Sequence, residues 1–317
     1  MIPEHEKRIY EYEEIIAKLK EQSEINGIRA DEDIARLEEK LEEMKKEVYS
    51  NLTPWQRVLI CRHAKRPRST DYIRNLFDEF EEISGDRLFR NDPAIITGLG
   101  VVAGVKFMII GQEKGHDTES RLFHNFGMPH PEGYRKALRA MKLAEKFALP
   151  VLSLIDTPGA YPGLAAEERG QGSAIAVNLF EMASLTVPVI VIVIGEGCSG
   201  GALGIGLGDA VAMLEHSYYS VISPEGCASI LWKDPKKNEE ATEALKIRAE
   251  DLLAFGVIDT VIREPLGGAH HDPDAVYSRV RSFLLKEEER LNALSPDLLV
   301  DKRYGKFRAM GAFSTVR

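Results

Sequence analysis

The sequence predicts an α/β fold, and three observations carry that prediction. Short apolar runs rich in valine and isoleucine, such as VLSLI and VIVIVI, are typical of buried strands. Longer segments such as PEGYRKALRAMKLAEKFA have the apolar spacing of helices and lie between those runs. The chain has 317 residues, 44% of them hydrophobic, which is enough for one large core or two smaller ones. Strands that alternate with helices of this length indicate a sheet with much parallel pairing.

The segment from Glu4 to about Tyr49 is charged and low in glycine and proline. Its apolar residues recur at alternating steps of three and four, at Ile9, Tyr12, Ile16 and Leu19 and then at Ile34, Leu37, Leu41, Met44 and Val48. This spacing predicts two amphipathic helices with a break near Asn26 and Gly27. Each helix has too few heptads for a free-standing coiled coil, so we expect a helical hairpin that docks on the body of the protein. Contact with another chain is the alternative.

The rest of the chain follows the α/β pattern in order. After a basic connector, CRHAKRPRSTDYI, the runs IITGLGVV and VKFMII predict a β-hairpin. Further strands are predicted at VLSLI, VIVIVI, VAML, YSVI and VIDTVI, and helices at PEGYRKALRAMKLAEKFA, EERGQGSAIAVNLFEMASL and EEATEALKIRAEDLLAFG. We therefore divide the chain into an N-terminal helical segment (1–54), an α/β body (55–300) and a C-terminal tail (301–317).

Charge and cysteine content narrow the class of protein. A net charge of −9 and a pI near 5.5 argue against a chain that coats nucleic acid or anionic lipid, although the basic stretch 62–68 could hold phosphate. Cys61, Cys198 and Cys227 are odd in number and form no C-x-x-C pair, so neither a disulfide framework nor a zinc site is predicted. The charged N-terminus and the lack of a long apolar run predict a cytoplasmic protein without membrane insertion.

The stretch GEGCSGGALGIG, residues 195–206, matches two known patterns. Gly195, Gly197 and Gly200 follow a predicted strand and spell the dinucleotide fingerprint, and Glu215 stands where a ribose-binding acid is expected. However, the next residues, GALGIGLGD, would form a poor helix, since each glycine inside a helix costs about 1 kcal/mol relative to alanine. The dinucleotide interpretation is therefore disfavoured.

The same stretch also spells the nucleophile elbow G-x-S-x-G with Ser199 at its centre. Asp259 and then His270 or His271 follow in the order that a serine hydrolase requires. With 50 acidic residues and eight histidines in the chain, that order is weak support. We favour Ser199 as a small residue at a tight turn and Cys198 as a small buried hydrophobe.

A physical interpretation of the glycines holds without either pattern. Consecutive glycines between a strand and a helix present unpaired backbone N–H groups to a closely approaching ligand, which predicts an anion or oxyanion site at Gly200 and Gly201. A second such turn, IDTPGAYPG, follows the preceding strand. Two turns after successive strands indicate a cleft lined by backbone donors. We expect Gly159, Ala160 and Tyr161 to contact substrate there.

Four segments carry a resemblance to a known family: FGMPHPEGYRKALRAMKLAEKF, IDTPGAYPGLAAEERGQ, VIGEGCSGGALGIGLGD and YSVISPEGCASILWKD. They resemble the α-subunit family of bacterial-type acetyl-CoA carboxylase carboxyltransferases. The likeness runs from about Trp55 to about Val300 and extends to the N-terminal helices. It implies a crotonase-like fold of the ClpP/crotonase superfamily, built from stacked ββα units, so that 55–300 would be a CoA carboxyltransferase domain.

The resemblance implies transfer of a carboxyl group to acetyl-CoA, giving malonyl-CoA for fatty acid synthesis. The donor would be carboxybiotin, presented as a co-substrate by the biotin carboxyl carrier protein. The family's α chain works with a homologous β chain as an α2β2 assembly, alongside biotin carboxylase. Zinc is expected on the β subunit, and the lack of zinc-binding cysteines in this chain agrees with that. No covalently bound cofactor is expected here.

The resemblance also implies roles for individual residues. The amides of Gly200 and Gly201 would receive the ureido oxygen of biotin as an oxyanion hole. Cys198 is a departure, since the family commonly has glycine at that position. No acid/base pair is required, because released biotin can take the proton from the acetyl group. The alternatives are a subunit of another biotin-dependent acyl-CoA carboxyltransferase, a serine hydrolase using Ser199, and a noncatalytic scaffold.

Overall fold

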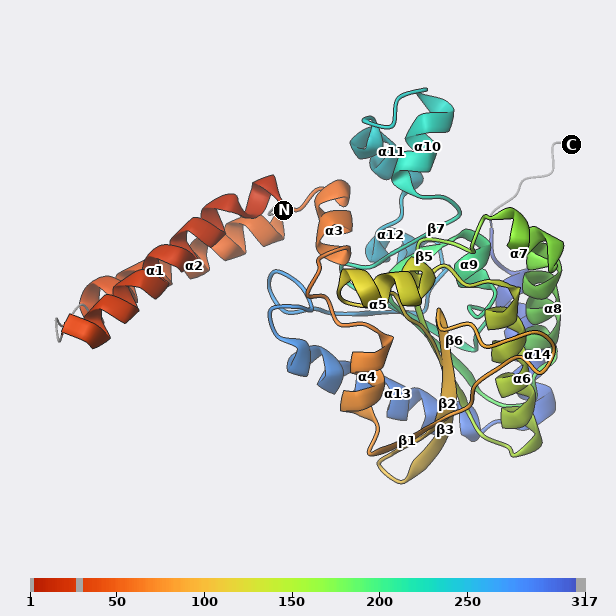
Figure 1. Cartoon of the computed structure of the whole chain (residues 1–317). Helices are drawn as coiled ribbons and strands as arrows, with labels where there is room; N and C mark the ends of the chain where they lie inside the picture. The colour runs from red at the N-terminus through yellow and green to blue at the C-terminus, as the bar shows by residue number, and fades with distance from the viewer. Residues whose placement is uncertain (1–2, 27–30, 312–317) are drawn as a thin grey trace, which may run out of the picture.

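A mixed sheet of eight strands forms the centre of the computed structural model, which describes residues 3–26 and 31–311 (Figure 1). The strand order is β1-β2-β3-β4-β5-β6-β8, and β7 pairs with the end of β5. Strands β1 to β3 are antiparallel, whereas the pairings from β3 onward are parallel. The bounds are β1 (Glu79–Glu82), β2 (Ile95–Val102), β3 (Val105–Gln112), β4 (Val151–Thr157), β5 (Val189–Cys198), β6 (Ala210–Leu214), β7 (Tyr218–Ser220) and β8 (Thr260–Ile262).

Helices cover both faces of this sheet (Figure 1). Val151 and Ile155 of β4 pack on the face that carries α6 and α8, while Leu152 and Leu154 pack with α4 and α13. Burial on both faces explains why the β5 run VIVIVI is continuously apolar. The helices of the body are α3 (Pro54–Cys61), α4 (Ser69–Leu76), α5 (Thr118–Phe123), α6 (Pro131–Lys146), α7 (Leu164–Glu168), α8 (Gln171–Ser184), α9 (Ser199–Leu203), α10 (Pro224–Leu231), α11 (Asn238–Leu245), α12 (Ala249–Ala254), α13 (Pro273–Asn292) and α14 (Pro296–Arg308), with the 3-10 turn η2 (Asn125–Gly127). The 3-10 turn η1 (Glu4–Glu6) directly precedes the N-terminal hairpin.

The predicted α/β class, the β-hairpin of β2 and β3 and the five further strands are confirmed, with changes at several boundaries. Two predicted helices are each divided by a residue with positive φ. Gly170, with φ 80°, separates α7 from α8, and Lys246, with φ 52°, ends α11 before α12. A left-handed residue cannot continue a right-handed helix. The last predicted strand is shorter than expected, because only Thr260–Ile262 pairs with β6.

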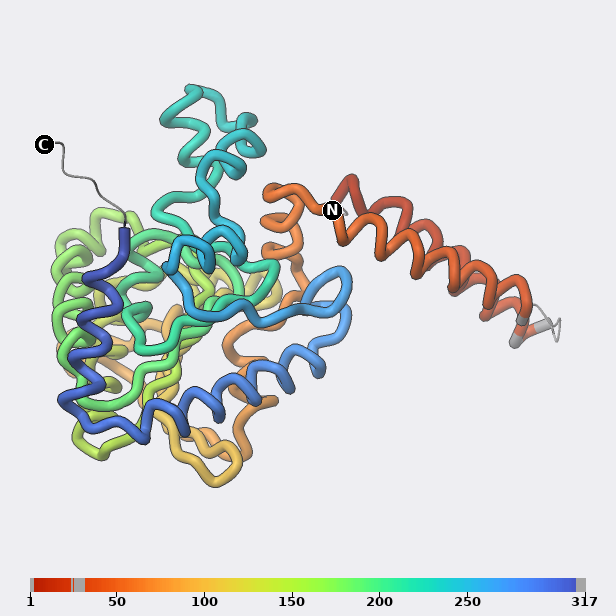
Figure 2. The backbone as a smooth tube through the Cα atoms, turned by 180° about the vertical axis from the view of Figure 1, so that it is seen from behind, coloured from red at the N-terminus to blue at the C-terminus, as the bar shows by residue number. Residues whose placement is uncertain are grey.

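The N-terminal hairpin consists of α1 (Lys7–Asn26) and α2 (Asp31–Ser50). The two helices pack on each other through one apolar cluster formed by Ile9, Ile16, Ile34, Leu41 and Tyr49 together with Leu52 and Ile60. Both views show the hairpin projecting away from the sheet (Figures 1 and 2). The predicted hairpin is confirmed, and among the described residues its contact with the body is confined to its base. Its apolar stripe is already covered by its own partner helix. The hairpin meets the body at its base, where Ile60 of α3 joins this cluster and the Tyr49 ring meets the His271 ring edge to face.

The C-terminal boundary predicted at residue 300 falls inside α14, so residues 301–308 belong to the body. Arg303 is 1% exposed. Its guanidinium donates to the carbonyls of Met182, Leu185 and Val187 at the end of α8, and it forms an ion pair with Asp209 at 2.7 Å. Residues 312–317 of the predicted tail lie outside the described residues. No helix in the described ranges is long and apolar enough to span a membrane.

We expect Arg303→Met to lower the free energy of unfolding of the full chain by about 3–5 kcal/mol, because Asp209 and three carbonyls would lose a buried partner. Urea denaturation measures this change. The control is Arg308→Met in the same helix, whose exposed side chain should change stability by less than about 0.5 kcal/mol. Equal stability of the two variants would contradict the role given to Arg303.

Candidate active site

Two glycine-rich turns follow the carboxyl ends of neighbouring parallel strands. β4 ends at Thr157 and β5 ends at Cys198, and Thr157 stands opposite Gly197 in the sheet. The turn after β4 contains residues 158–163, and the turn after β5 opens α9. They therefore lie side by side at the edge of the sheet where open parallel sheets bind ligands.

The two turns contact each other backbone to backbone at Gly201. A Cβ atom added to Gly201 would lie 2.5 Å from the carbonyl carbon of Gly159 and 2.6 Å from the nitrogen of Ala160. The Gly201 carbonyl also accepts hydrogen bonds from the Gln112 side chain at 2.7 Å and the Tyr134 hydroxyl at 3.3 Å. Only glycine permits this approach, so this residue fixes the spacing of the two turns.

Gly200 is placed differently from its neighbour. A Cβ atom added to it would make an ordinary contact, 3.4 Å from Cδ1 of Ile175. The N–H groups of Gly200 and Gly201 stand in the first turn of α9, where no carbonyl of the helix can accept from them. The preceding residue, Ser199, has φ 50°, a left-handed conformation that turns the chain sharply out of β5. Neither amide therefore has an acceptor within its own helix, and Gly201 is a buried residue.

The predicted substrate contacts occupy the turn after β4. The Gly159 N–H donates to Oγ1 of Thr157 at 3.0 Å, and the Tyr161 N–H donates to the carbonyl of Pro129 at 3.0 Å. The Tyr161 ring stacks on His130, with 4.1 Å between the ring centroids. Within the described chain, the N–H of Ala160 has no acceptor. Of the three amides, that of Ala160 is the one left to bind a ligand.

A buried lysine links the strands that lead into the two turns. Nζ of Lys114, which follows β3, is 2.7 Å from Oδ1 of Asp156 in β4 and 2.6 Å from Oε1 of Glu196 in β5. The Glu196 N–H donates to Asp156 at 2.9 Å. Arg68 and Arg62 supply one further cation each, at 2.8 Å from Asp156 and 2.8 Å from Glu196. The network fixes both turns from beneath.

The network keeps both carboxylates ionised. Burial alone would raise the pKa of Asp156, but Lys114 and Arg68 outweigh it and hold that pKa below its usual value. The same competition lowers the pKa of Glu196: Lys114 and Arg62 outweigh its burial, and the Tyr218 hydroxyl donates a hydrogen bond to it at 2.5 Å. Neither carboxylate is poised to exchange a proton near neutral pH, so they act as positioning groups.

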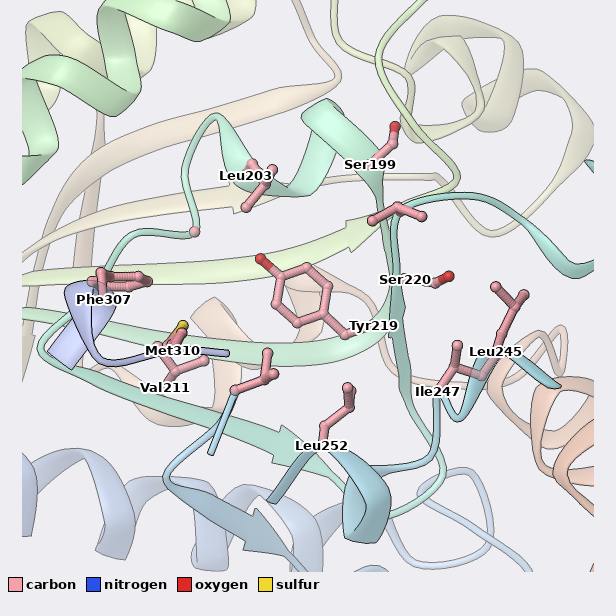
Figure 3. Close-up of a pocket in the computed structure, with 13 residues that line it drawn as sticks. Ser199, Leu203, Val211, Tyr219, Ser220, Leu245, Ile247, Leu252, Phe307 and Met310 are labelled. Carbon is pink, nitrogen blue, oxygen red and sulfur yellow. The ribbon is translucent and has the colours of Figure 1, made fainter. Parts of the chain in front are cut away.

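An apolar cavity of about 380 Å³ begins at Ser199, beside the glycine pair (Figure 3). The Tyr219 ring projects into the middle of this cavity in Figure 3. Burial raises the pKa of its hydroxyl to about 12, so the phenol is neutral at physiological pH. The other walls include Leu203 of α9, Val211 of β6, Leu245 of α11, Leu252 of α12, Phe307 of α14 and Met310, which follows α14.

The geometry does not support the two motif-based alternatives. No hydrogen bond joins Ser199 to a histidine anywhere in the described chain, and His270 stacks on His63 with 3.7 Å between ring centroids. Gly195 and Gly197 lie inside β5 instead of in a phosphate-binding turn. A Cβ atom on Gly195 would collide with the carboxylate of Asp156, which explains that glycine by packing.

Cys198 is a buried residue of β5, and its thiol donates to the Tyr218 hydroxyl at 3.4 Å. Burial raises the pKa of the thiol to about 11. The side chain therefore points into the network beneath the turn and is not a nucleophile. In the parts of the chain that the structure describes, no group of three or more metal-ligating side chains is arranged to bind a metal.

The network that supports the turns could not be predicted from the sequence. The basic stretch 62–68, expected to be a possible phosphate patch, places three of its arginines on acidic partners: Arg62 on Glu196, Arg66 on Glu264 and Arg68 on Asp156. The one sequence signal was that clustering of arginines. It could not reveal that each one is separated from its acid by 88 or more residues.

Comparisons with known proteins agree with this architecture. Transcarboxylase 12S shares 20% identity and a TM-score of 0.55 over 72% of this chain and 44% of its own. A Pseudomonas malonate decarboxylase hetero-tetramer in complex with coenzyme A shares 15% identity and a TM-score of 0.55 over 67% of this chain and 84% of its own. At such identities these structures establish the fold alone. The predicted fold class, a crotonase-like arrangement, is confirmed.

Sequence relatives are much closer. The family model described as acetyl co-enzyme A carboxylase carboxyltransferase-like matches residues 2–311. The acetyl-coenzyme A carboxylase carboxyl transferase subunit alpha of Chlamydia pneumoniae is 61% identical over 98% of this chain and 96% of its own, and that of Chlamydia caviae is 60% identical over the same shares. The chain belongs to the acetyl-CoA carboxylase carboxyltransferase α-subunit family.

Proposed function

We propose that this chain is the α subunit of the carboxyltransferase component of acetyl-CoA carboxylase. It would transfer a carboxyl group from carboxybiotin, presented by a carrier protein, to acetyl-CoA. The single observation that carries this proposal is the pair of glycine turns packed against each other after β4 and β5, in a chain of this family. The turns offer backbone donors and no paired nucleophile, which suits a reaction controlled by charge stabilisation and positioning.

The residues present fit the biotin group in two respects. The N–H groups of Gly200 and Gly201 have no helical acceptor, so they can donate to the ureido oxygen, where negative charge develops as the carboxyl group departs. The apolar cavity that begins at Ser199 matches the apolar part of the group. Carboxybiotin supplies the carboxyl group; the chain's own residues bind and orient it. Ala160, flanked by Gly159 and Tyr161, would contact the acyl substrate.

The proposal includes partners that the chain needs for activity. A homologous β subunit would complete an α2β2 assembly, provide most of the thioester pocket and carry the zinc. The biotin carboxyl carrier protein and biotin carboxylase would complete the enzyme in the cytoplasm, and its product would feed fatty acid synthesis. Co-expression with the β-type subunit of the same genome, followed by an assay of carboxyl exchange between malonyl-CoA and biocytin, tests this. Activity of the mixture and not of either chain alone is expected; no exchange in the assembled mixture would refute the function.

Replacing Ser199 with alanine separates the proposed reaction from serine hydrolysis. We expect the Ser199→Ala complex to keep its carboxyl exchange within about tenfold of wild type, because Ser199 has no general base. A hydrolase would lose several orders of magnitude. Exchange and thioester hydrolysis should be measured on the same preparation. Thioester hydrolysis by the chain alone that disappears in the variant would refute our assignment.

A further inference from the structure

A cationic pocket of about 280 Å³ lies at the start of the turn after β4, where Pro158 forms part of its lining. Its lining combines Pro158, which directly precedes Gly159, with Glu196 and Phe126 and with four cations, Arg62, Arg68, Lys114 and Arg121. We propose that this pocket, through Arg121 and Arg68, binds the carboxylate of the malonyl thioester. The inference rests on the proposed function and assigns a subsite to it.

Charge pairing leaves donors unused in this pocket. Arg62 is satisfied by Glu196, Glu225 and the Tyr218 hydroxyl, and Lys114 by Asp156 and Glu196. Arg68, whose side chain is 4% exposed, uses one nitrogen on Asp156, and its buried Nε has no partner. Nη2 of Arg68 also has no hydrogen-bond partner in the described chain, so this guanidinium keeps a terminal donor for an anion in the pocket.

Arg121 of α5 adds a cation whose partner is missing. Its half-buried side chain makes no ion pair or hydrogen bond with any residue in the described ranges. Three carboxylates, Asp156, Glu196 and Glu225, pair with the other three cations of the pocket. Arg121 is therefore the one cation of the pocket lining without a carboxylate partner in the described residues, and a guanidinium can bind a carboxylate with two parallel hydrogen bonds.

The loop that places Phe126 in this pocket is held in a strained conformation. Asn125, Phe126 and Gly127 all have positive φ, of 50°, 55° and 77°. The Gly127 carbonyl accepts from the Thr157 hydroxyl at 2.6 Å, which ties the loop to the turn after β4. Strain of this kind persists where the surroundings enforce it and gathers at functional sites. Here it brings an apolar ring to the rim of a cationic pocket.

The position of the pocket favours a carboxylate over a phosphate. Pro158 belongs to the same turn as Ala160, and that turn contacts Gly201, so the pocket adjoins the place where the carboxyl group would be transferred. Phe126 and Pro158 suit the methylene next to the carboxylate. A phosphate of coenzyme A carries the same kind of anionic oxygen, but it is present in both malonyl-CoA and acetyl-CoA, so comparing the two ligands distinguishes the two sources.

The test measures binding of malonyl-CoA and acetyl-CoA to the assembled α and β complex by calorimetry. We expect Arg121→Gln to weaken malonyl-CoA binding by roughly tenfold or more, the scale of one charged hydrogen bond, and to leave acetyl-CoA binding within about twofold. Arg121→Lys should restore part of the loss. The matched control, Arg74→Gln on the exposed side of α4, should change neither affinity.

Two results would overturn the inference. Equal weakening of both ligands would mean that Arg121 contacts a phosphate of coenzyme A, and unchanged affinity for both would mean that the pocket binds neither group. Carboxyl exchange, measured on the same wild-type complex, keeps this test separate from that of the proposed function. If the wild-type complex is active and the Arg121→Gln complex binds malonyl-CoA with unchanged affinity, the subsite is contradicted and the proposed function is not.

Discussion

Lys114→Met should inactivate the enzyme and destabilise the chain. The substitution removes one cation from two buried carboxylates, Asp156 and Glu196, which each keep a single arginine. We expect a loss of about 3 kcal/mol or more in the free energy of unfolding, the scale measured for broken buried pairs. Because both glycine turns follow these carboxylates, we also expect carboxyl exchange to fall by about a hundredfold.

The pH dependence of that variant provides a second readout. In the wild-type chain, both carboxylates have lowered pKa values, so their contribution to stability is present above their unfolded pKa of about 4 and is lost as the pH falls through the lower folded pKa. In Lys114→Met the folded pKa values rise. The stability difference between the two proteins should therefore be largest at neutral pH and shrink in acid.

The control for this experiment is Lys106→Met, an exposed lysine of β3, the strand that precedes Lys114. It should match wild type within about 0.5 kcal/mol and retain exchange. Denaturant unfolding at several pH values and exchange assays on the assembled complex give both quantities. A fully active Lys114→Met complex would show that the network does not position the turns.

Gly201→Val and Gly200→Ala should have different effects, although the two glycines are adjacent. A side chain on Gly201 collides with the backbone of Gly159 and Ala160, so the turns must separate. We expect Gly201→Val to lose about 1–3 kcal/mol of stability, as overpacked sites do, and at least about a hundredfold in exchange. The activity loss alone cannot then be attributed to the amide of Gly201.

Gly200→Ala isolates the chemical role, because its new Cβ has room at 3.4 Å from Ile175. We expect stability within about 1 kcal/mol of wild type and correct assembly with the β subunit. Turnover should still fall, since a methyl group beside the amide obstructs a ligand that must approach the backbone closely. Thermal melting, gel filtration and exchange should be measured on one preparation. Wild-type turnover by this variant would remove the oxyanion site from Gly200.

The glycine turns could be predicted from sequence because their pattern is local. A strand followed at once by glycines is readable within about ten residues, and the register of β4 with β5 then brings the turns together. The partners of Lys114 could not be predicted in this way. Glu196 is separated from it by 82 residues, and nothing in the sequence near either residue specifies the pairing. Long-range ion pairs depend on the order of strands in the sheet, which periodicity does not determine.

The helices also divide into those that the local sequence predicts and those that depend on long-range contacts. The amphipathic spacing of α1, α2 and α6 was sufficient to predict them, whereas the 20-residue α13 was not predicted at all. The predicted C-terminal tail failed for a related reason. Arg303 and Lys306 give α14 a charged sequence typical of an exposed segment, but Arg303 is buried because its guanidinium replaces the hydrogen bonds that the end of α8 lacks. A helix that is held in place by one buried cation does not need a regular spacing of apolar residues, so hydrophobic periodicity does not predict it.

The projecting hairpin has a consequence for how the chain folds during synthesis. The contacts between α1 and α2 join residues that are close in sequence, so the hairpin can form as soon as its two helices have left the ribosome. The body cannot fold this early. Its strands β4, β5, β6 and β8 pair in parallel across long stretches of sequence, and Arg303 of α14, near the end of the chain, is needed to pair with the buried side chain of Asp209. In the nascent chain, the N-terminal hairpin would thus be folded before the α/β body, which cannot complete its fold until the residues of α14 have been translated.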